Sequence, residues 1–233
     1  VKINGHAGLA CQKQAEDLVD KEGVILIEPV GNMEPIKDLV TDFKQFWDKI
    51  NQVKPYLQPK GDVPQKERHQ TPELFLKIDD SSNCIMCAAC YSDCNVLEVD
   101  SNFLGPAALA KAQRFVGDSR DSKTLERVKA LSEFGGIWDC THCGECVERC
   151  PKPVKPFDRI KEIMAVALDQ GIHNNNGARH ALSFTKSIKN SGRLNENQLP
   201  VESVGLFNIK GLFSLIPVGL RMFLKGKIPP IIH

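Results

Sequence analysis

The chain has 233 residues, a formal net charge of +1, 42% hydrophobic residues and 25% charged residues. These values are typical of an ordinary globular protein of one or two domains. The near-neutral charge provides no large positive field, which argues against nucleic-acid binding. No apolar run reaches the length that a bilayer-spanning helix needs.

The N-terminal third predicts a β-rich region, a helix and a linker. Residues 1–30 are predicted to be β structure, with Val24–Ile27 as a short apolar strand. Pro35 is predicted to open a helix, because the apolar residues after it recur at helical spacing, and this helix places Trp47 in the core. Residues 54–76 are rich in proline and predict an extended linker.

The rest of the chain is predicted to be mainly helical. Gly105–Pro106 begins a helix rich in small residues, and Ser122 is expected to cap the next one. Pro156 precedes a third helix that stops at Gly171. Asn174–Asn176 is expected to be a loop.

The C-terminal tail predicts an amphipathic helix, because apolar residues line one face from Ile209 to Leu224 and basic residues line the other. Pro217 is expected to kink or end this helix. Such a helix can lie on an anionic membrane or fill a groove of a partner, and the alternative is a helix folded back on its own domain.

Eight of the nine cysteines form two short runs, each with the spacing C-x2-C-x2-C-x3-C. The runs are Cys84, Cys87, Cys90, Cys94 and Cys140, Cys143, Cys146, Cys150. Three thiolates in one tight loop can each bind a different iron of one cubane, and the fourth cysteine ligates the neighbouring cluster. The spacing therefore predicts an electron carrier with two iron–sulfur clusters.

Zinc and disulfides are the alternatives for these cysteines. A structural zinc ion takes four ligands, usually from two C-x2-C pairs, and the runs supply more sulfur than that. Disulfides are disfavoured because the cysteine count is odd and a chain of this length does not depend on covalent staples. Free thiols in this number indicate a reducing compartment.

Several stretches resemble the iron–sulfur subunit of succinate dehydrogenase and fumarate reductase. They are Glu28–Val30, Ile36–Val40, Val53–Leu57, Phe103–Leu109, Arg114–Phe115 and Asp118–Asp121. With the cysteine runs, the resemblance covers about residues 1–160. It implies a β-grasp ferredoxin domain with a 2Fe–2S cluster, followed by a helical ferredoxin domain with two clusters.

The resemblance also implies which cysteines bind which cluster. One 4Fe–4S cluster would be held by Cys84, Cys87, Cys90 and Cys150. The second centre would be held by Cys94, Cys140 and Cys146, with Cys143 as an extra thiolate. Family members generally carry a non-cysteine at this extra position and hold a 3Fe–4S centre, so a fourth thiolate favours 4Fe–4S over 3Fe–4S. This pattern looks like the unconventional branch of the family, whose partner is a cysteine-rich, heterodisulfide-reductase-B-like subunit.

Three further residues lie close to the motifs. His142 and Trp138 neighbour the second run and are expected to surround its cluster without binding it. Cys11 matches the last of the four 2Fe–2S ligands of the family, and the alternative is a buried free cysteine. The third ligand of that pattern would fall before Val1, so we expect the N-terminus to be incomplete here. The 2Fe–2S cluster is expected only with the missing segment.

The predicted fold is therefore α+β, with a partial β-grasp region, an all-helical two-cluster domain and an amphipathic C-terminal helix. The expected domains are the β-grasp part with its following helix (1–53), the linker (54–76), the two-cluster domain (77–190) and the C-terminal extension (191–233).

No phosphate loop, dinucleotide fingerprint or Ser/His/Asp arrangement is recognisable, so the substrate chemistry must lie in another subunit. The resemblance implies an electron-transfer subunit of a succinate dehydrogenase or fumarate reductase complex. Its partners would be a flavoprotein with FAD and either a quinone-linked membrane anchor or a heterodisulfide-reductase-B-like subunit. The complex would lie peripherally on the cytoplasmic side of the inner or cell membrane, touching it through residues 206–228. The alternative is a heterodisulfide-reductase-C subunit, which shares the cysteine runs and the tail.

Overall fold

The computed structural model describes residues 1–227. The chain divides into two compact units, residues 1–167 and 168–233. The predicted domain boundaries after residues 53, 76 and 190 stay predictions. The last residues of the predicted extension to 233, and residue 228 of the predicted membrane contact, lie outside the described residues.

The first unit begins with short antiparallel strands. Strand β1 (Lys2–Ile3) lies between β2 (His6–Ala7) and β3 (Ile27–Glu28). The loop from β2 to β3 contains two 3-10 turns, η1 (Ala10–Gln12) and η2 (Ala15–Asp17).

The expected strand at residues 24–27 overlaps β3 at Ile27 alone. The reason is a local loop, in which the Asp20 carboxylate accepts a hydrogen bond from the Val24 backbone N–H at 2.8 Å. The Asp20 N–H in turn donates to the Val24 carbonyl at 3.0 Å. Val24 is 55% exposed.

The helix predicted from Pro35 is wrong in its first part. β4 (Pro35–Lys37) instead pairs with β5 (Val40–Thr41) in a hairpin, and Asp38 takes a left-handed conformation at the turn, with φ +52°. The apolar residues Ile36 and Val40 are 67% and 60% exposed, so their helical spacing does not reflect a buried helix face.

Helix α1 begins only at Lys44 and runs to Gln52. The Asp42 carboxylate accepts a hydrogen bond from the Lys44 backbone N–H at 2.7 Å, which satisfies one free donor of the first turn. Trp47 is 44% exposed, so the prediction that it lies in the core is wrong. Phe46 is fully buried instead and packs edge-on against Tyr91, with 5.4 Å between ring centroids.

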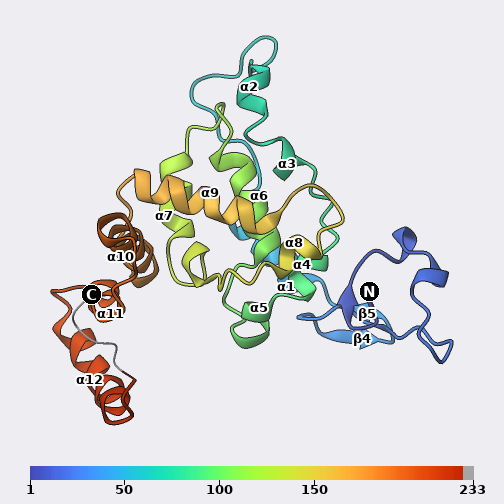
Figure 1. Ribbon diagram of the computed structural model, residues 1–233. Coiled ribbons are helices and arrows are strands. Elements are labelled where there is room, and N and C mark those ends of the chain that lie inside the picture. Colours follow the sequence, from blue (N-terminus) through green and yellow to red (C-terminus); the bar gives the residue numbers. More distant parts are fainter. Residues whose placement is uncertain (228–233) are drawn as a thin grey trace. The chain divides into compact units, whose positions relative to one another are not determined.

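Residues 53–71 contain no helix or strand, and the first unit is mainly helical after them (Figure 1). Its elements are α2 (Pro72–Phe75), α3 (Asp79–Ser82), α4 (Ala89–Ser92), α5 (Asn95–Val99), α6 (Pro106–Val116), α7 (Thr124–Leu131), η3 (Ile137–Asp139), α8 (Glu145–Glu148) and α9 (Pro156–Asp169). Helix α6 is central, because α1, α3, α4 and α7 all pack against it. Its four alanines are at most 2% exposed, and their small side chains allow this close approach.

The sequence predicted that Ser122 caps helix α7, and this prediction is wrong. The Ser122 hydroxyl donates to the Gln58 carbonyl at 2.9 Å, and α7 begins at Thr124. This bond is part of a network that ties residues 53–58 to the helices. Arg127 donates to the carbonyls of Val53, Lys54 and Tyr56 and also pairs with Asp121.

The N-terminal strands are joined to the segment that contains α4. The Asn32 side-chain amide donates to the carbonyls of Tyr91, Ser92 and Cys94 at 2.9 to 3.0 Å. The Gly31 N–H donates to the Ser92 hydroxyl at 2.8 Å, and a Cβ at Gly31 would lie 2.7 Å from the Ser92 carbonyl oxygen. Only glycine therefore permits this approach.

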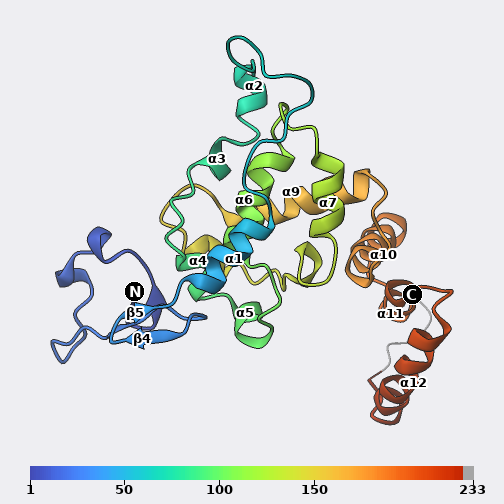
Figure 2. The same cartoon turned by 180° about the vertical axis from the view of Figure 1, so that it is seen from behind.

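The second unit contains α10 (Asn176–Ser191), α11 (Gln198–Val204) and α12 (Ile209–Leu224) (Figure 2). Asn175 is not simply part of a loop, because its side chain caps α10 by accepting from the Ala178 N–H at 2.8 Å. Arg179 donates to the Ser203 carbonyl at 3.0 Å and so joins α10 to α11.

Helix α12 runs through Pro217 to Leu224, so Pro217 does not end the helix, and the alternative that it kinks the helix stays a prediction. Proline cannot donate to the carbonyl of Phe213. Because both residues are exposed, water can satisfy that carbonyl. No helix in residues 1–227 is long and apolar enough to cross a bilayer.

We predict that the buried carboxylate of Asp118 stabilises the first unit. The Asp118 side chain is fully buried and pairs with Arg114 and Arg120. Burial alone would raise the pKa of Asp118, but the hydrogen bonds from the two arginines hold it well below its usual value. Asp118→Asn is expected to lower the free energy of unfolding by about 2 kcal/mol, because the partly buried guanidinium groups of Arg114 and Arg120 lose their buried counter-charge. Urea denaturation, followed by the visible absorbance of the bound clusters, measures this loss.

The contribution of Asp118 to the free energy of unfolding should depend on pH in one direction. A carboxylate with a lowered pKa stabilises the fold above its unfolded pKa, about 3.9, and loses that effect only as the pH falls toward the folded value. The difference between wild type and Asp118→Asn should therefore stay constant from pH 5 to 8. Asp48→Asn is the control and should change the stability little, because the pair of Asp48 with Lys44 is exposed to solvent. An equal loss in both variants would contradict the prediction.

Candidate metal centres

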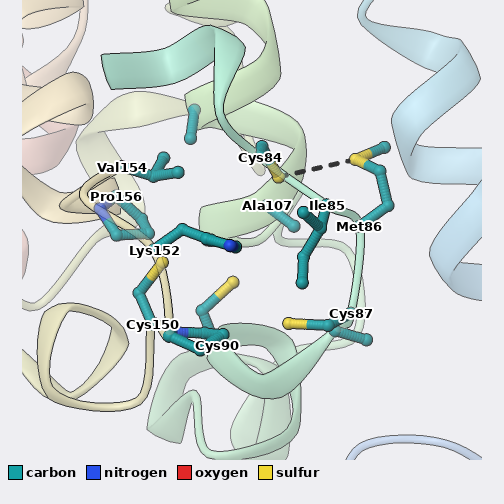
Figure 3. Close-up of a pocket in the computed structure, with 13 residues that line it drawn as sticks. Cys84, Ile85, Met86, Cys87, Cys90, Ala107, Cys150, Lys152, Val154 and Pro156 are labelled. Carbon is teal, nitrogen blue, oxygen red and sulfur yellow. Dashed lines mark hydrogen bonds between the residues drawn. The ribbon is translucent and has the colours of Figure 1, made fainter. Parts of the chain in front are cut away.

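The first centre is a cavity lined by four cysteines, two of which precede α4 in the loop Cys84–Ala88. Cys84, Cys87, Cys90 and Cys150 line it, with about 380 Å³ of empty space that includes open solvent. Figure 3 shows the sulfur atoms of Cys87, Cys90 and Cys150 facing a common space, into which Lys152 also extends. The Cys84 sulfur lies 3.6 Å from the Met86 sulfur.

The second centre is a cavity of similar size, with about 340 Å³ of empty space. It is lined by Cys94, Cys140, Cys143 and Cys146. Apolar side chains complete its wall, among them Phe103 from the loop before α6 and Phe157 and Ile160 from α9.

The two cysteine runs exchange one member. Cys150 joins three cysteines of the first run, and Cys94 joins three of the second. Helices α4 and α8, which follow the first cysteines of the two runs, pack against each other and make this exchange feasible. The structure thus groups the cysteines in the two sets that the resemblance implies, and their role as ligands stays a prediction.

The two cysteine loops have the same backbone conformation. In the first loop Met86 and Ala88 have φ of +57° and +61°, and in the second His142 and Gly144 have φ of +60° and +82°. Each pair follows the first cysteine of its run by two and four residues. Alternation of left-handed and right-handed residues turns successive N–H groups toward one side, and such concavities bind anions and iron–sulfur clusters.

Sequence reasoning missed this feature, because three of the four residues are not glycine. A left-handed conformation costs a residue with a Cβ about 1–2 kcal/mol, so the surrounding fold must impose it. The repeated spacing of the cysteines was the only signal in the sequence that the two loops would share a conformation.

Backbone N–H groups donate to several of the sulfur atoms. The Cys94 sulfur accepts from Val96 and Leu97, and the Cys150 sulfur from Lys152 and Val154. Cys140 accepts from the His142 N–H and Cys146 from the Phe157 N–H. Hydrogen bonds of this kind stabilise thiolates and tune the potential of a bound cluster.

Burial has the opposite effect on the free thiols. It raises the pKa of Cys90, Cys94, Cys140, Cys146 and Cys150, to about 12 for Cys146. The thiolate is the form that binds metal, so these thiols would have to release their protons in order to bind iron.

The other predicted site residues lie around the second run. Cys143 is exposed at the edge of the second cavity. His142 is largely exposed, with its ring centroid 5.1 Å from that of Phe157, and partial desolvation of the imidazole together with the charge of Lys161 lowers its pKa. Trp138 lines neither cysteine cavity, and its buried indole N–H has no hydrogen-bond partner in residues 1–227.

Cys11 is not grouped with the other cysteines. It is exposed in η1, so the alternative that it is a buried free cysteine is wrong. It lines neither cysteine cavity. A wider cavity lies nearby between the loop Gly8–Lys13 and the segment Glu148–Pro151, and Cys150 contributes to it as well.

The donor chemistry of both cavities fits iron–sulfur clusters. Each cavity offers four sulfur atoms, apolar walls and backbone N–H donors to sulfur, which are the features that hold and tune such clusters. Within residues 1–227, no group of three or more Cys, His, Asp or Glu side chains converges on a single-ion site. The cysteines that bind a cubane can lie farther apart than the ligands of a single metal ion, because each thiolate binds a different iron.

Two family models match the chain. One describes a 4Fe–4S dicluster domain and matches residues 80–154, and the other describes a 2Fe–2S iron–sulfur cluster binding domain and matches residues 1–48. Together with the cysteine cavities, these matches define the chain as an iron–sulfur electron-transfer protein of the ferredoxin type.

Similar proteins with established names indicate the family within this class of iron–sulfur proteins. The iron–sulfur subunit of the 8-methylmenaquinol:fumarate reductase of Wolinella succinogenes is 32% identical over 99% of this chain and 73% of its own. The succinate dehydrogenase iron–sulfur subunit of Coxiella burnetii is 37% identical over 73% of this chain and 72% of its own. The fumarate reductase iron–sulfur subunit of Mycobacterium tuberculosis is 40% identical over 71% and 67%.

A solved structure agrees with these relatives. The Sdh1 complex of Mycobacterium smegmatis in the apo form contains a chain that matches with a TM-score of 0.60 and 26% identity, over 72% of this chain and 71% of that one. The chain belongs to the family of iron–sulfur subunits of succinate dehydrogenase and fumarate reductase. It is therefore an electron-transfer subunit of an oxidoreductase, which is the first of the two alternatives that the sequence left open.

Proposed function

We propose that this chain relays single electrons between a flavoprotein subunit that interconverts succinate and fumarate and a second, quinone-linked subunit. The pair of adjacent cavities, each lined by four cysteines, carries the proposal. Bound iron–sulfur clusters supply the one-electron chemistry. The chain's own side chains hold the clusters, exclude water from them and insulate them within helices α6 and α9.

Each cysteine has a role in this proposal. Cys84, Cys87, Cys90 and Cys150 hold one 4Fe–4S cluster, and Cys94, Cys140, Cys143 and Cys146 hold the second. Cys11 serves as one ligand of a 2Fe–2S cluster in the N-terminal domain. Hydride chemistry at succinate requires a flavin, and FAD belongs to the flavoprotein partner.

The identity of the second centre depends on Cys143. Its thiol lies at the exposed edge of the second cavity, where it can reach a fourth iron. A cysteine in this place supports a 4Fe–4S centre over 3Fe–4S, because thiolate is the usual ligand of iron in such clusters.

The second unit supports a particular partner. The Wolinella relative aligns over 99% of this chain, whereas the other two align over 171 and 167 residues, about the length of the first unit. The Wolinella protein is named for 8-methylmenaquinol and fumarate. By analogy, we propose a menaquinone-type acceptor or donor, reached through a cysteine-rich, heterodisulfide-reductase-B-like subunit.

Helix α12 supports peripheral attachment to the cytoplasmic side of the membrane. Residues 203–227 contain four basic residues and no acidic one. Phe213 and Phe223 are 65% and 68% exposed, and Leu224 is 74% exposed. Apolar side chains beside basic ones are typical of helices that lie in the headgroup region of an anionic membrane.

Purification of the native complex through a tag on this chain tests the relay. We expect a flavin-containing subunit and a cysteine-rich subunit to co-purify, and we expect succinate or a menaquinol to bleach the visible absorbance of the clusters. A complex with a flavoprotein but without a cysteine-rich subunit would refute the heterodisulfide-reductase-like partner. A preparation with zinc in place of iron and sulfide would refute the relay itself.

The role of Cys143 can be tested by iron analysis and paramagnetic resonance. Oxidised wild type is expected to show no stoichiometric 3Fe–4S signal. Cys143→Ser is expected to show that signal and to lose about one iron per chain, because one iron loses its protein ligand. Cys11→Ser is the control and should leave both four-iron centres unchanged. A full 3Fe–4S signal in the wild type would contradict the assignment.

Binding of the full chain to lipid vesicles tests the role of α12. We expect co-sedimentation with phosphatidylglycerol vesicles, weaker binding in high salt and little binding to phosphatidylcholine. Phe213→Ser combined with Phe223→Ser should abolish binding, and Lys225→Gln should weaken it about fivefold, since one cation contributes about 1 kcal/mol. Phe184→Ser, which removes a 44% exposed aromatic from α10, is the matched control. Equal binding to both lipids would contradict the membrane role.

A further inference from the structure

Lys49 is an unusual residue in helix α1, because its charged end is buried. The residue is only 7% exposed, and its Nζ has no hydrogen-bond partner in the part of the chain that the structure describes. Lysine usually buries its aliphatic stem and keeps its ammonium in water. An ammonium that lies in the interior without hydrogen bonds destabilises the fold unless a negative charge compensates it.

The surroundings of Lys49 point toward the second centre. The ammonium lies 5.2 Å from the centre of the Tyr91 ring, and Tyr91 belongs to the short segment between Cys90 and Cys94. Burial lowers the pKa of Lys49, and the negative charges that oppose this shift are those of Cys94 and Asp100.

Neither Tyr91 nor Asp100 accounts fully for this buried charge. Asp100 already accepts two hydrogen bonds from Asn102, at 2.8 and 2.9 Å, and makes no ion pair with Lys49. The Tyr91 ring attracts the cation but carries no net charge. Asp100 keeps its charge without pairing directly with Lys49, and the larger opposing charge is that of Cys94 and whatever its sulfur binds.

We propose that Lys49 is a buried counter-charge for the second iron–sulfur centre and raises its reduction potential. The inference rests on the proposed role of Cys94 as a ligand of that centre. A cluster bound by thiolates is negatively charged and gains a further negative charge on reduction. A fixed positive charge in a medium of low dielectric therefore stabilises the reduced form more than the oxidised form.

The effect is specific to one of the two centres. Among the charges that act on Lys49 is that of Cys94, which lines the second cavity. Lysines on the surface of the same helix are screened by water and salt. Lys49 therefore separates the potentials of two neighbouring clusters and favours the electron on the second one.

Redox titration of the purified complex, monitored by paramagnetic resonance, tests the proposal. Lys49→Met keeps the length and apolar character of the side chain and removes its charge. At a fixed solution potential, we expect the ratio of reduced to oxidised second centre to fall about tenfold. This change corresponds to a reduction potential lower by about 59 mV for a one-electron couple. Lys49→Arg, which keeps the charge, should stay within about twofold of the wild type.

Two controls separate this effect from a structural one. Lys44→Met removes an exposed charge from the same helix and should leave both centres unchanged. The first centre should titrate alike in the wild type and in Lys49→Met. The proposal is wrong if Lys49→Met retains its iron yet the second centre does not shift, if both centres shift equally, or if Lys49→Arg behaves as Lys49→Met.

Iron analysis of the same samples tests the ligand role of Cys94 separately from the electrostatic role of Lys49. Loss of the second centre in Cys94→Ser supports the ligand assignment, and an intact second centre in Cys94→Ser would refute that assignment and the role of Lys49 with it. If Lys49→Met loses iron, Lys49→Gln provides the same charge removal with a side chain that can hydrogen-bond. Its second centre should show the same tenfold shift, and an unchanged ratio there also refutes the proposal.

Discussion

The exchange of one cysteine between two distant loops is the constraint on which the rest of this structure depends. Cys150 completes the first cavity and Cys94 completes the second, so neither group of four sulfurs exists unless α4 and α8 are packed together. The packing in turn depends on α6, whose alanines let four helices approach it closely. Because ligation and packing require each other, loading of the clusters and folding of the first unit are expected to be coupled.

Within this frame, local electrostatics determine how each centre behaves. Backbone N–H groups beside Cys94, Cys140 and Cys150 donate to the sulfurs of these residues. Residues such as Met86, Ala88 and His142 adopt left-handed conformations in the two cysteine loops, which the surrounding fold imposes at a cost. Apolar walls keep water away and raise the pKa of the free thiols. Near the second centre, a buried lysine adds a positive charge that the first centre does not share, so two chemically similar clusters can differ in potential.

The junction between the β region and the helices serves the same purpose over a longer distance. Asn32 binds three carbonyls around α4, and Gly31 approaches the Ser92 carbonyl more closely than any residue with a Cβ could. These contacts fix the N-terminal region against the segment between Cys90 and Cys94. An electron carrier needs such rigid junctions, because the rate of electron transfer depends on the distance between centres. The second unit, with its capped helices and exposed apolar surface, is suited instead to contact with a membrane or a partner.

The sequence by itself determined the family, the iron–sulfur chemistry and the helices around α6 and α9. Cysteine spacing and proline positions are local signals, so they can be interpreted without knowledge of the fold. It could not determine that Ile36 and Val40 belong to a hairpin, because an exposed apolar hairpin and a buried helix face share that spacing over a few residues. Nor could it place Trp47 at the surface, cap α10 with Asn175, or reveal the left-handed residues of the cysteine loops. Only the tertiary structure decided these points and the burial of Lys49, because each depends on which distant segment lies beside the residue, and no local pattern encodes that.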